Sequence, residues 1–209
     1  MMADKTQTPK PGMTIAYRLG DALYLNITNR CANACRFCIR QSPAGVGYEL
    51  WLEHEPTVAE IMAAVGDLAS YREVVFCGYG EPLDRPEVVI AVAQQIKAGW
   101  SLPIRINTNG LADLTLGRDI LPALQGLIDV ISISLNGSDP QSYQEVSQSR
   151  FGLAAYPAVC AFAQRSKSYI PRVILSVVRY PGVDVDAAAR VAAEIGAEFR
   201  VREMQGFEK

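Results

Sequence analysis

Three cysteines within eight residues, Cys31, Cys35 and Cys38, are the strongest chemical signal in this sequence. Their spacing is C-x3-C-x2-C, and they follow an apolar stretch over residues 23–28 that has the pattern of a β-strand. Cysteine thiolates hold the irons of iron–sulfur clusters, and three on one short loop suit a cube of four irons. Three ligands leave one iron open to a small molecule. The spacing therefore predicts a cluster that binds a ligand at its open iron.

Other uses of clustered cysteines fit the sequence less well. A structural zinc site takes four ligands, and the fourth would have to be Cys77, Cys160 or the single histidine, His54, none of which stands at a paired spacing. Five cysteines in 209 residues do not suggest a disulfide framework. Simple burial does not cluster cysteines in this way. We expect Cys77 and Cys160 in the core, although Cys77 borders a glycine-rich turn and could face the site.

Composition and charge narrow the class of protein. The chain is 49% hydrophobic and 20% charged, as is ordinary for a globular protein, and its formal net charge is −2. This charge gives no electrostatic case for binding nucleic acid or an anionic membrane. No apolar run approaches the roughly 18–20 residues that span a bilayer. Residues 1–12 are polar and lack the apolar segment of a signal peptide, so we expect a disordered lead-in there, one domain over residues 13–209, and a cytoplasmic location.

Strand-like and helix-like patterns alternate along the chain. The expected strands are residues 23–28, 73–78, 104–108, 130–135, 172–179 and 198–203, and the expected helices are 58–70, 86–100, 119–127, 140–148, 154–168 and 185–195. Thr57 with Glu60, and Pro86, are typical of helix starts. Strand–helix alternation predicts a parallel sheet with right-handed crossovers. Six units are too few for a closed eight-stranded barrel, so the predicted fold is α/β with an open, curved six-stranded sheet.

Several of these strands alternate polar with apolar residues, which is unusual for parallel strands covered on both faces. The residues that share the polar face are Tyr24, Asn26, Thr28, Arg105, Asn107, Asn109, Ser132, Ser134, Asn136, Arg200 and Arg202. Polar groups need partners when they leave water, so a shared polar face predicts a hydrated cavity that holds a ligand. The three arginines suit an anionic ligand if they face this cavity, and surface ion pairs explain each of them equally well.

Three turn-like motifs follow the expected strands. They are Cys77-Gly-Tyr-Gly-Glu-Pro82, Asn107-Thr-Asn-Gly110 and Asn136-Gly-Ser-Asp-Pro140. Each alone is an ordinary turn or helix cap, and the first lacks the spacing of a dinucleotide-binding or phosphate-binding loop. Because these motifs and the cysteine loop all lie where a strand ends, we expect them at the carboxyl edge of the sheet, where parallel α/β folds bind ligands.

In this order the motifs resemble those of the radical S-adenosylmethionine superfamily, over residues 14–203. The cysteine spacing is that of the superfamily, with an aromatic residue, Phe37, before the last cysteine. More narrowly, LYLNITNRCANACRFCIR, FCGYGEPL, ISISLNG, the Phe-Gly at 151–152 and FRVRE are similar to the TatD-linked radical subfamily, which is named for genes beside TatD-type metal hydrolases. Tyr79 departs from the Gly-Gly-Glu of many relatives, which leaves the backbone geometry of that turn open.

The resemblance implies an open partial (β/α)6 barrel of the TIM type, the radical SAM core. It also implies a [4Fe–4S] cluster on Cys31, Cys35 and Cys38, whose open iron chelates the amino and carboxylate groups of S-adenosylmethionine. The implied contacts with this cofactor are Gly78, Gly80, Glu81 and Pro82 from the motif that meets the methionine amino group, Ser132, Ser134 and Asn136 for the carboxylate and ribose, Thr108 and Asn109 at the ribose edge, Phe37 and Val201 beside adenine, and Arg150 as a further carboxylate partner.

The implied reaction is reductive cleavage of S-adenosylmethionine to methionine and a 5′-deoxyadenosyl radical, which abstracts hydrogen from a substrate that the sequence does not identify. An electron donor such as flavodoxin or ferredoxin, and a functional link to a TatD-type hydrolase, follow from the same resemblance. Two alternatives stay open: an activase that places a radical on a partner protein, and a non-catalytic electron-transfer protein that carries the cluster. Residues 41–55 either form a lid over the site or pack under the barrel.

Overall fold

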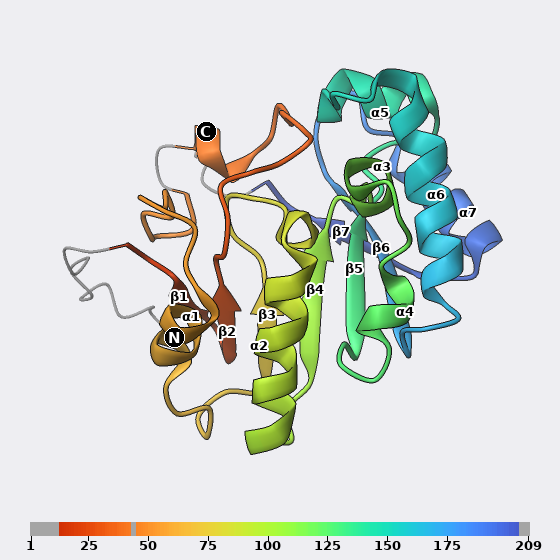
Figure 1. Ribbon diagram of the computed structural model, residues 1–209. Coiled ribbons are helices and arrows are strands. Elements are labelled where there is room, and N and C mark those ends of the chain that lie inside the picture. The colour runs from red at the N-terminus through yellow and green to blue at the C-terminus, as the bar shows by residue number, and fades with distance from the viewer. Residues whose placement is uncertain (1–12, 43–44, 205–209) are drawn as a thin grey trace.

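One seven-stranded sheet organises the protein, whose computed structural model describes residues 13–42 and 45–204. The lead-in expected over residues 1–12 lies outside the described residues. The strands, in their spatial order, are β1 (Ala16–Leu19), β2 (Ala22–Leu25), β3 (Glu73–Phe76), β4 (Ile104–Thr108), β5 (Val130–Ser134), β6 (Arg172–Val178) and β7 (Glu198–Arg202). β1 runs antiparallel to β2, and each later strand is parallel to the one before it. The two edge strands of this sheet do not pair with each other, so the sheet is an open arc, which confirms the predicted α/β partial barrel (Figure 1).

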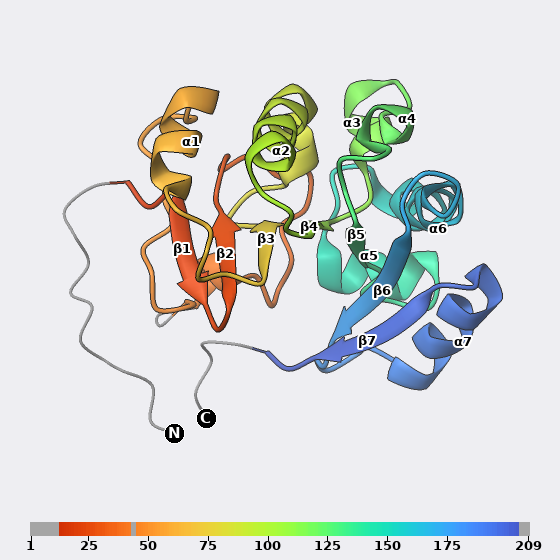
Figure 2. The same cartoon turned by 90° about the horizontal axis from the view of Figure 1, so that it is seen from below.

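Helices cover the convex side of the arc, where α1, α2, α6 and α7 lie (Figure 2). The helices are α1 (Val58–Val65), α2 (Pro86–Gly99), α3 (Ala112–Leu116), α4 (Leu121–Leu124), α5 (Pro140–Ser147), α6 (Ala155–Ser166) and α7 (Val185–Ile195), with short 3-10 helices η1 (Ile39–Gln41), η2 (Pro82–Asp84) and η3 (Gly152–Ala154). The predicted start signals are confirmed: Thr57 and Glu60 form a capping box, and α2 begins at Pro86. Within residues 13–42 and 45–204, no helix has the length and apolar character needed to cross a membrane.

The first strand is one that the pattern analysis misses. β1 joins β2 through a tight hairpin whose turn contains Gly20, with a φ of 58°, followed by Asp21. Glycine adopts this left-handed conformation without steric cost. β1 has four residues and precedes the strand–helix alternation, so only the hairpin turn marks it in the sequence.

Two helical expectations are also wrong in their extent. The helix expected over residues 58–70 ends at Val65, because Gly66 takes a φ of 58° and a ψ of −137°. The segment expected as one helix over residues 119–127 is only the single turn α4, and α3 precedes it and ends at Gly117, which is left-handed. In each case a local turn conformation overrides a helical hydrophobic pattern.

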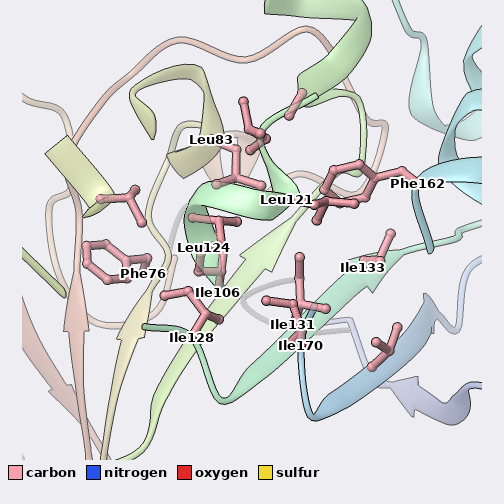
Figure 3. Packing of buried hydrophobic residues seen from close by; sticks show 14 of the residues in the cluster. Phe76, Leu83, Ile106, Leu121, Leu124, Ile128, Ile131, Ile133, Phe162 and Ile170 are labelled. Atoms are coloured by element: carbon pink, nitrogen blue, oxygen red, sulfur yellow. The ribbon is translucent and has the colours of Figure 1, made fainter. Parts of the chain in front are cut away.

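The core lies between the sheet and its helices (Figure 3). Ile106 of β4 and Ile131 of β5 belong to the same buried cluster as Leu124 of α4 and Phe162 of α6, and none of the four is more than 1% exposed. Burying a side chain of this size stabilises a protein by about 1.5–3 kcal/mol. The apolar halves of the alternating strands therefore hold the helices in place and leave the opposite face of the sheet for other groups.

That opposite face, the concave side of the arc, is polar as the alternation predicts. The pairing register sets Asn107 beside Ser132 and Ser134 beside Ser176. Arg202 of β7 reaches Ser134 with a hydrogen bond of 3.2 Å, which places it on the same face. We call this surface the inner face of the sheet.

Candidate functional site

The cysteine loop follows β2 and is joined by backbone contacts to the end of α5 and the residues after it. Asn33 forms a β-bridge with Ser149, beyond the end of α5. Further backbone hydrogen bonds join the loop to the same segment, namely Ala34 N–H to the Ser147 carbonyl (3.1 Å), Arg36 N–H to the Val146 carbonyl (2.9 Å) and Arg150 N–H to the Ala32 carbonyl (2.9 Å). The loop therefore has a defined backbone path at the carboxyl edge of the sheet, where it was predicted.

The three thiols of this loop are close enough to influence one another. Burial raises the pKa of Cys35 to about 12, and the neighbouring Cys31 and Cys38 raise it further in the same direction. Burial likewise raises the pKa of Cys31 to about 11, with a smaller contribution from the charge of Glu81. Buried thiols of this kind stay protonated at neutral pH unless a cation displaces the protons, as bound metals do.

The donor set fits an iron–sulfur cube better than a zinc ion. Across the described ranges, no three Cys, His, Asp or Glu side chains converge on one point as ligands of a single ion do. A cube does not require this, because each cysteine binds a different iron. Of the three candidates for a fourth zinc ligand, His54 pairs with Glu60 on the surface at 2.9 Å and Cys160 lies on α6. The third, Cys77, directly follows β3 and forms no metal-holding group with the three cysteines. The thiols thus suit a cluster with three protein ligands.

The Gly-Tyr-Gly-Glu turn after β3 lies directly against the start of the cysteine loop. A Cβ atom on Gly80 would come within 2.2 Å of the Thr28 carbonyl oxygen and 2.7 Å of the Arg30 carbonyl oxygen. On Gly78 it would come within 2.0 Å of Asn26 Oδ1. Only glycine permits such an approach, so both glycines serve to bring two loops of the site together.

The carboxylate of Glu81 is fully engaged by the protein. It accepts hydrogen bonds from Thr108 Oγ1 (2.7 Å), from the Leu83 N–H (3.0 Å) and from the Asn109 N–H (2.6 Å). The side chain is buried, and burial raises its pKa to about 7 although these three bonds lower it. Glu81 therefore acts as a positioning residue that ties the end of β3 to the end of β4.

Asn109 extends this connection to the cysteines. Its side-chain nitrogen lies 3.7 Å from Cys31 Sγ, and its Oδ1 accepts from the Leu111 N–H at 2.9 Å. Hydrogen bonds to cysteine sulfur are one of the features that tune iron–sulfur clusters. Two predicted site motifs, from β3 and β4, thus meet the cysteine loop through one chain of contacts.

The β5 motif supplies three polar residues, and Asn136 among them has a hydrogen-bond acceptor that the protein does not use. Ser132 and Ser134 lie on the inner face, and Asn136 follows them with a φ of 48°. The Oδ1 atom of Asn136 is buried and has no hydrogen-bond partner in the protein. A left-handed, non-glycine residue with an orphaned buried oxygen is costly, and such positions are typical of ligand sites.

The remaining predicted residues lie in three different surroundings. Phe37 is buried in a small apolar cluster with Val146 and Val178, and its ring meets Tyr180 edge-on at 5.4 Å. Val201 pairs with Val177 of β6 and packs against the main core, on the helix-covered side. Arg150 is exposed, and its guanidinium lies 4.8 Å from the ring centre of the adjacent Phe151.

Asn26, expected on the polar face, and Asn29, which the sequence analysis does not name, are supporting residues. Asn26 is fully buried on the β2 side, donates to the Leu50 carbonyl at 2.7 Å and accepts from the Tyr79 N–H at 3.3 Å. Asn29 makes a pair of hydrogen bonds with the backbone of Leu52, at 2.8 and 3.1 Å. The signal for Asn26 in the sequence is its place in the alternation of the expected strand over residues 23–28, whereas Asn29 lies beyond that strand and has no such signal.

These two asparagines form hydrogen bonds with the backbone of residues 50–52, in the segment that follows the cysteine loop. Leu50 is fully buried and packs with Tyr17 and Tyr79, while Trp51 is 50% exposed and meets the Tyr79 ring edge-on at 5.3 Å. Positions 43 and 44, within the range considered as a lid, lie outside the described residues. Leu50 thus packs against Tyr17 of β1 and Tyr79 of the turn after β3, and the choice between a lid and packing under the barrel stays a prediction. A pocket of about 360 Å³ here is lined by Arg40, Ser42, Gly45, Gly47, Tyr48, Glu49, Trp51 and Tyr79.

Comparison with known proteins gives one family. The profile of the radical SAM superfamily matches residues 25–195. The fold is similar to solved structures of TYW1 with a lysine–pyruvate adduct bound (TM-score 0.62, 12% identity, covering 90% of this chain and 67% of that chain), of a radical SAM methyltransferase from Sphaerobacter thermophilus (0.59, 20%, 90% and 57%) and of methylornithine synthase (0.58, 16%, 88% and 53%). This chain spans little more than half the length of the last two. No curated protein matches it in sequence. Because the profile covers most of its length, this chain belongs to the radical S-adenosylmethionine (radical SAM) superfamily.

Proposed function

We propose that this chain is a radical SAM enzyme that holds a [4Fe–4S] cluster on Cys31, Cys35 and Cys38 and uses it to abstract hydrogen from a substrate. The observation that carries the proposal is the continuous contact from Glu81 through Asn109 to Cys31. It joins the cysteine loop to the turn that would receive S-adenosylmethionine. The match to the superfamily over residues 25–195 supports the same assignment.

When bound, the cluster would supply the electron that cleaves the carbon–sulfur bond of S-adenosylmethionine. This chemistry belongs to the cofactor rather than to the protein. The protein's own part is to position the cofactor and to exclude water from the site. The backbone bonds to residues 146–150 fix the path of the cysteine loop, and the Asn109 amide donates to one of its sulfurs. On loading, the buried thiols would bind as thiolates and release their protons to solvent.

The contacts with S-adenosylmethionine follow from the groups that remain free. Because the Glu81 carboxylate is occupied, the methionine amino group meets the backbone of the turn at 78–82. The orphaned Oδ1 of Asn136 is an acceptor that suits a ribose hydroxyl. Phe37, with Val146 and Val178, offers an apolar surface for adenine. The packing of Val201 on the other side of the sheet lends no support to a direct contact from that side chain.

The partners of the reaction are proposed from the sequence alone. A flavodoxin or ferredoxin supplies the electron, as radical SAM proteins require. The motifs shared with the TatD-linked subfamily support a functional link to a TatD-type metal hydrolase. Cleavage that appears only when a partner protein is added would favour the activase alternative over a small-molecule enzyme.

The test is anaerobic reconstitution with iron and sulfide, followed by dithionite and S-adenosylmethionine, with 5′-deoxyadenosine measured by mass spectrometry. We expect the product from the native chain and from Cys160→Ala, a matched control on α6, and none from Cys35→Ala. Visible absorption spectra of the reconstituted proteins should show that Cys35→Ala alone loses the cluster absorbance. A cluster that forms but binds no S-adenosylmethionine would overturn the enzyme and leave an electron-transfer protein.

A further inference from the structure

Three arginines were expected on the inner face, and the structure distinguishes them by their counterions. Arg105 is neutralised: its Nη2 and Nε lie 2.7 and 3.1 Å from the two carboxylate oxygens of Glu73, and its Nη1 donates to Asn107 Oδ1 at 2.8 Å. Arg200 is exposed to solvent. Arg105 therefore already has a counterion, and the charge of Arg200 is solvated by water.

Arg202 differs from both. It is half-buried on β7, and its Nη2 donates to Ser134 Oγ at 3.2 Å. Its Nε is buried without any hydrogen-bond partner, and no acidic side chain of residues 13–42 or 45–204 forms an ion pair with it. This guanidinium therefore has no counterion among the described residues and one buried donor unused.

No carboxylate of the described residues compensates Arg202. Its electrostatic neighbours are Cys77 and Cys35 and the cations Arg200 and Arg105. None of these groups accepts a hydrogen bond from its Nε, which is buried. A buried donor is costly to leave unpaired, so the geometry of this face calls for an acceptor beside Arg202.

We propose that Arg202 anchors an anionic group, a carboxylate or a phosphate, of the substrate. This inference rests on the proposed function. Nε and Nη2 form the side-on edge of the guanidinium, which grips such anions through two parallel hydrogen bonds. The carboxylate of S-adenosylmethionine is the competing occupant, and titration of the protein saturated with S-adenosylmethionine distinguishes the two. Arg202 interacts electrostatically with both Cys35 in the cysteine loop and Cys77 at the end of β3, so an anion bound by Arg202 would lie beside the cofactor site.

The experiment uses the full chain, reconstituted with its cluster and saturated with S-adenosylmethionine. Inorganic phosphate and succinate serve as probes, and calorimetric titration measures their dissociation constants. We expect at least one probe to bind the native protein, and Arg202→Gln to weaken it by about tenfold or more, the loss typical of a charged hydrogen bond. Arg202→Lys, which keeps the charge but not the fork, should bind the probe with intermediate affinity.

The controls separate this inference from its alternatives. Arg200→Gln on the same strand should leave probe binding unchanged. In Arg202→Gln the affinity for S-adenosylmethionine should match the native protein, and the thermal midpoint without added anion should be no lower than that of the native protein. Weakened S-adenosylmethionine binding with unchanged anion binding would assign Arg202 to the cofactor and overturn the inference, as would a native protein that binds neither probe. A chain that takes up no cluster would instead refute the proposed function, and titrating that cluster-free chain would still test whether Arg202 binds the anion.

Discussion

The side-chain amide of Asn109 lies 3.7 Å from the sulfur of Cys31, so a residue at the end of β4 contacts the cysteine loop that follows β2. The same residue donates its backbone N–H to Glu81, which is the last residue of the turn after β3. Three strand ends thus share one junction. The following predictions test that junction and the elements that support it.

Replacing Asn109 by aspartate should lower the reduction potential of the bound cluster. The substitution keeps the oxygen that accepts from the Leu111 N–H, removes the donor to Cys31 and adds a negative charge nearby. Fewer hydrogen bonds to sulfur and more local negative charge both stabilise the oxidised cluster. Redox titration followed by electron paramagnetic resonance measures the shift, and an unchanged or higher potential would contradict the role assigned to this amide.

Gly80→Ala should disrupt the site, whereas Gly99→Ala should not. The new methyl group at position 80 would come within 2.2 Å of the Thr28 carbonyl oxygen. Because this oxygen belongs to the backbone, it cannot move away without distorting the loop. A methyl group at position 99, on the last residue of α2, meets nothing within 4 Å. We expect Gly80→Ala to lose about 1–3 kcal/mol of unfolding free energy and most binding of S-adenosylmethionine. Gly99→Ala should be neutral or gain about 0.5–1 kcal/mol. Equal urea midpoints for the two variants would refute the close approach.

Glu81→Gln should destabilise the protein although it preserves size and shape. One carboxylate oxygen becomes an NH2 group that faces donors, so either the Asn109 N–H or the Thr108 and Leu83 donors lose their acceptor. An unsatisfied buried donor costs about 1–3 kcal/mol. Glu87→Gln, which breaks an exposed pair with Arg118, is the matched control and should cost about 0–1 kcal/mol. Chemical unfolding at pH 8, where the native carboxyl is ionised, compares the two.

The capping box of α1 should give the protein a measurable acid sensitivity. Hydrogen bonds from the Thr57 backbone and side chain, and one from His54, lower the pKa of Glu60 to about 2. The unfolded-state pKa of a glutamate is about 4.3. The folded value is the lower one, so this contribution is present above about pH 4.3 and is lost as the pH falls toward 2. Glu60→Gln should flatten that part of the profile of thermal midpoint against pH. A variant with the same acid slope as the native protein would show that the box contributes nothing.

Much of the fold follows from the hydrophobic period of the sequence. The strand Ile104–Thr108 and the helix Val185–Ile195 begin and end where the pattern predicts, because the burial of their side chains follows the period. The short elements do not. β1 and α3 have four and five residues, which is less than the pattern needs, and their limits depend on turns at Gly20 and Gly117.

The site divides in the same way between local and distant information. The spacing of Cys31, Cys35 and Cys38 is contained in one short segment, so the sequence alone identifies it. Which inner-face arginine lacks a counterion depends on the register of neighbouring strands, because that register brings Glu73 to Arg105 and no acid to Arg202. The sequence displays three equivalent arginines, and only the pairing of strands makes them different.

The backbone partners of the cysteine loop, residues 146–150, are made long after the cysteines themselves. On the ribosome the three thiols emerge early and have nothing to hold their loop until β3, β4, β5 and α5 have followed. These long-range contacts raise the contact order of the fold. A nascent chain that stops before α5 presents open thiols, which oxidants attack most readily when they are exposed. The chain therefore has to extend through α5 before the loop can take the backbone path that would present its thiols to a cluster.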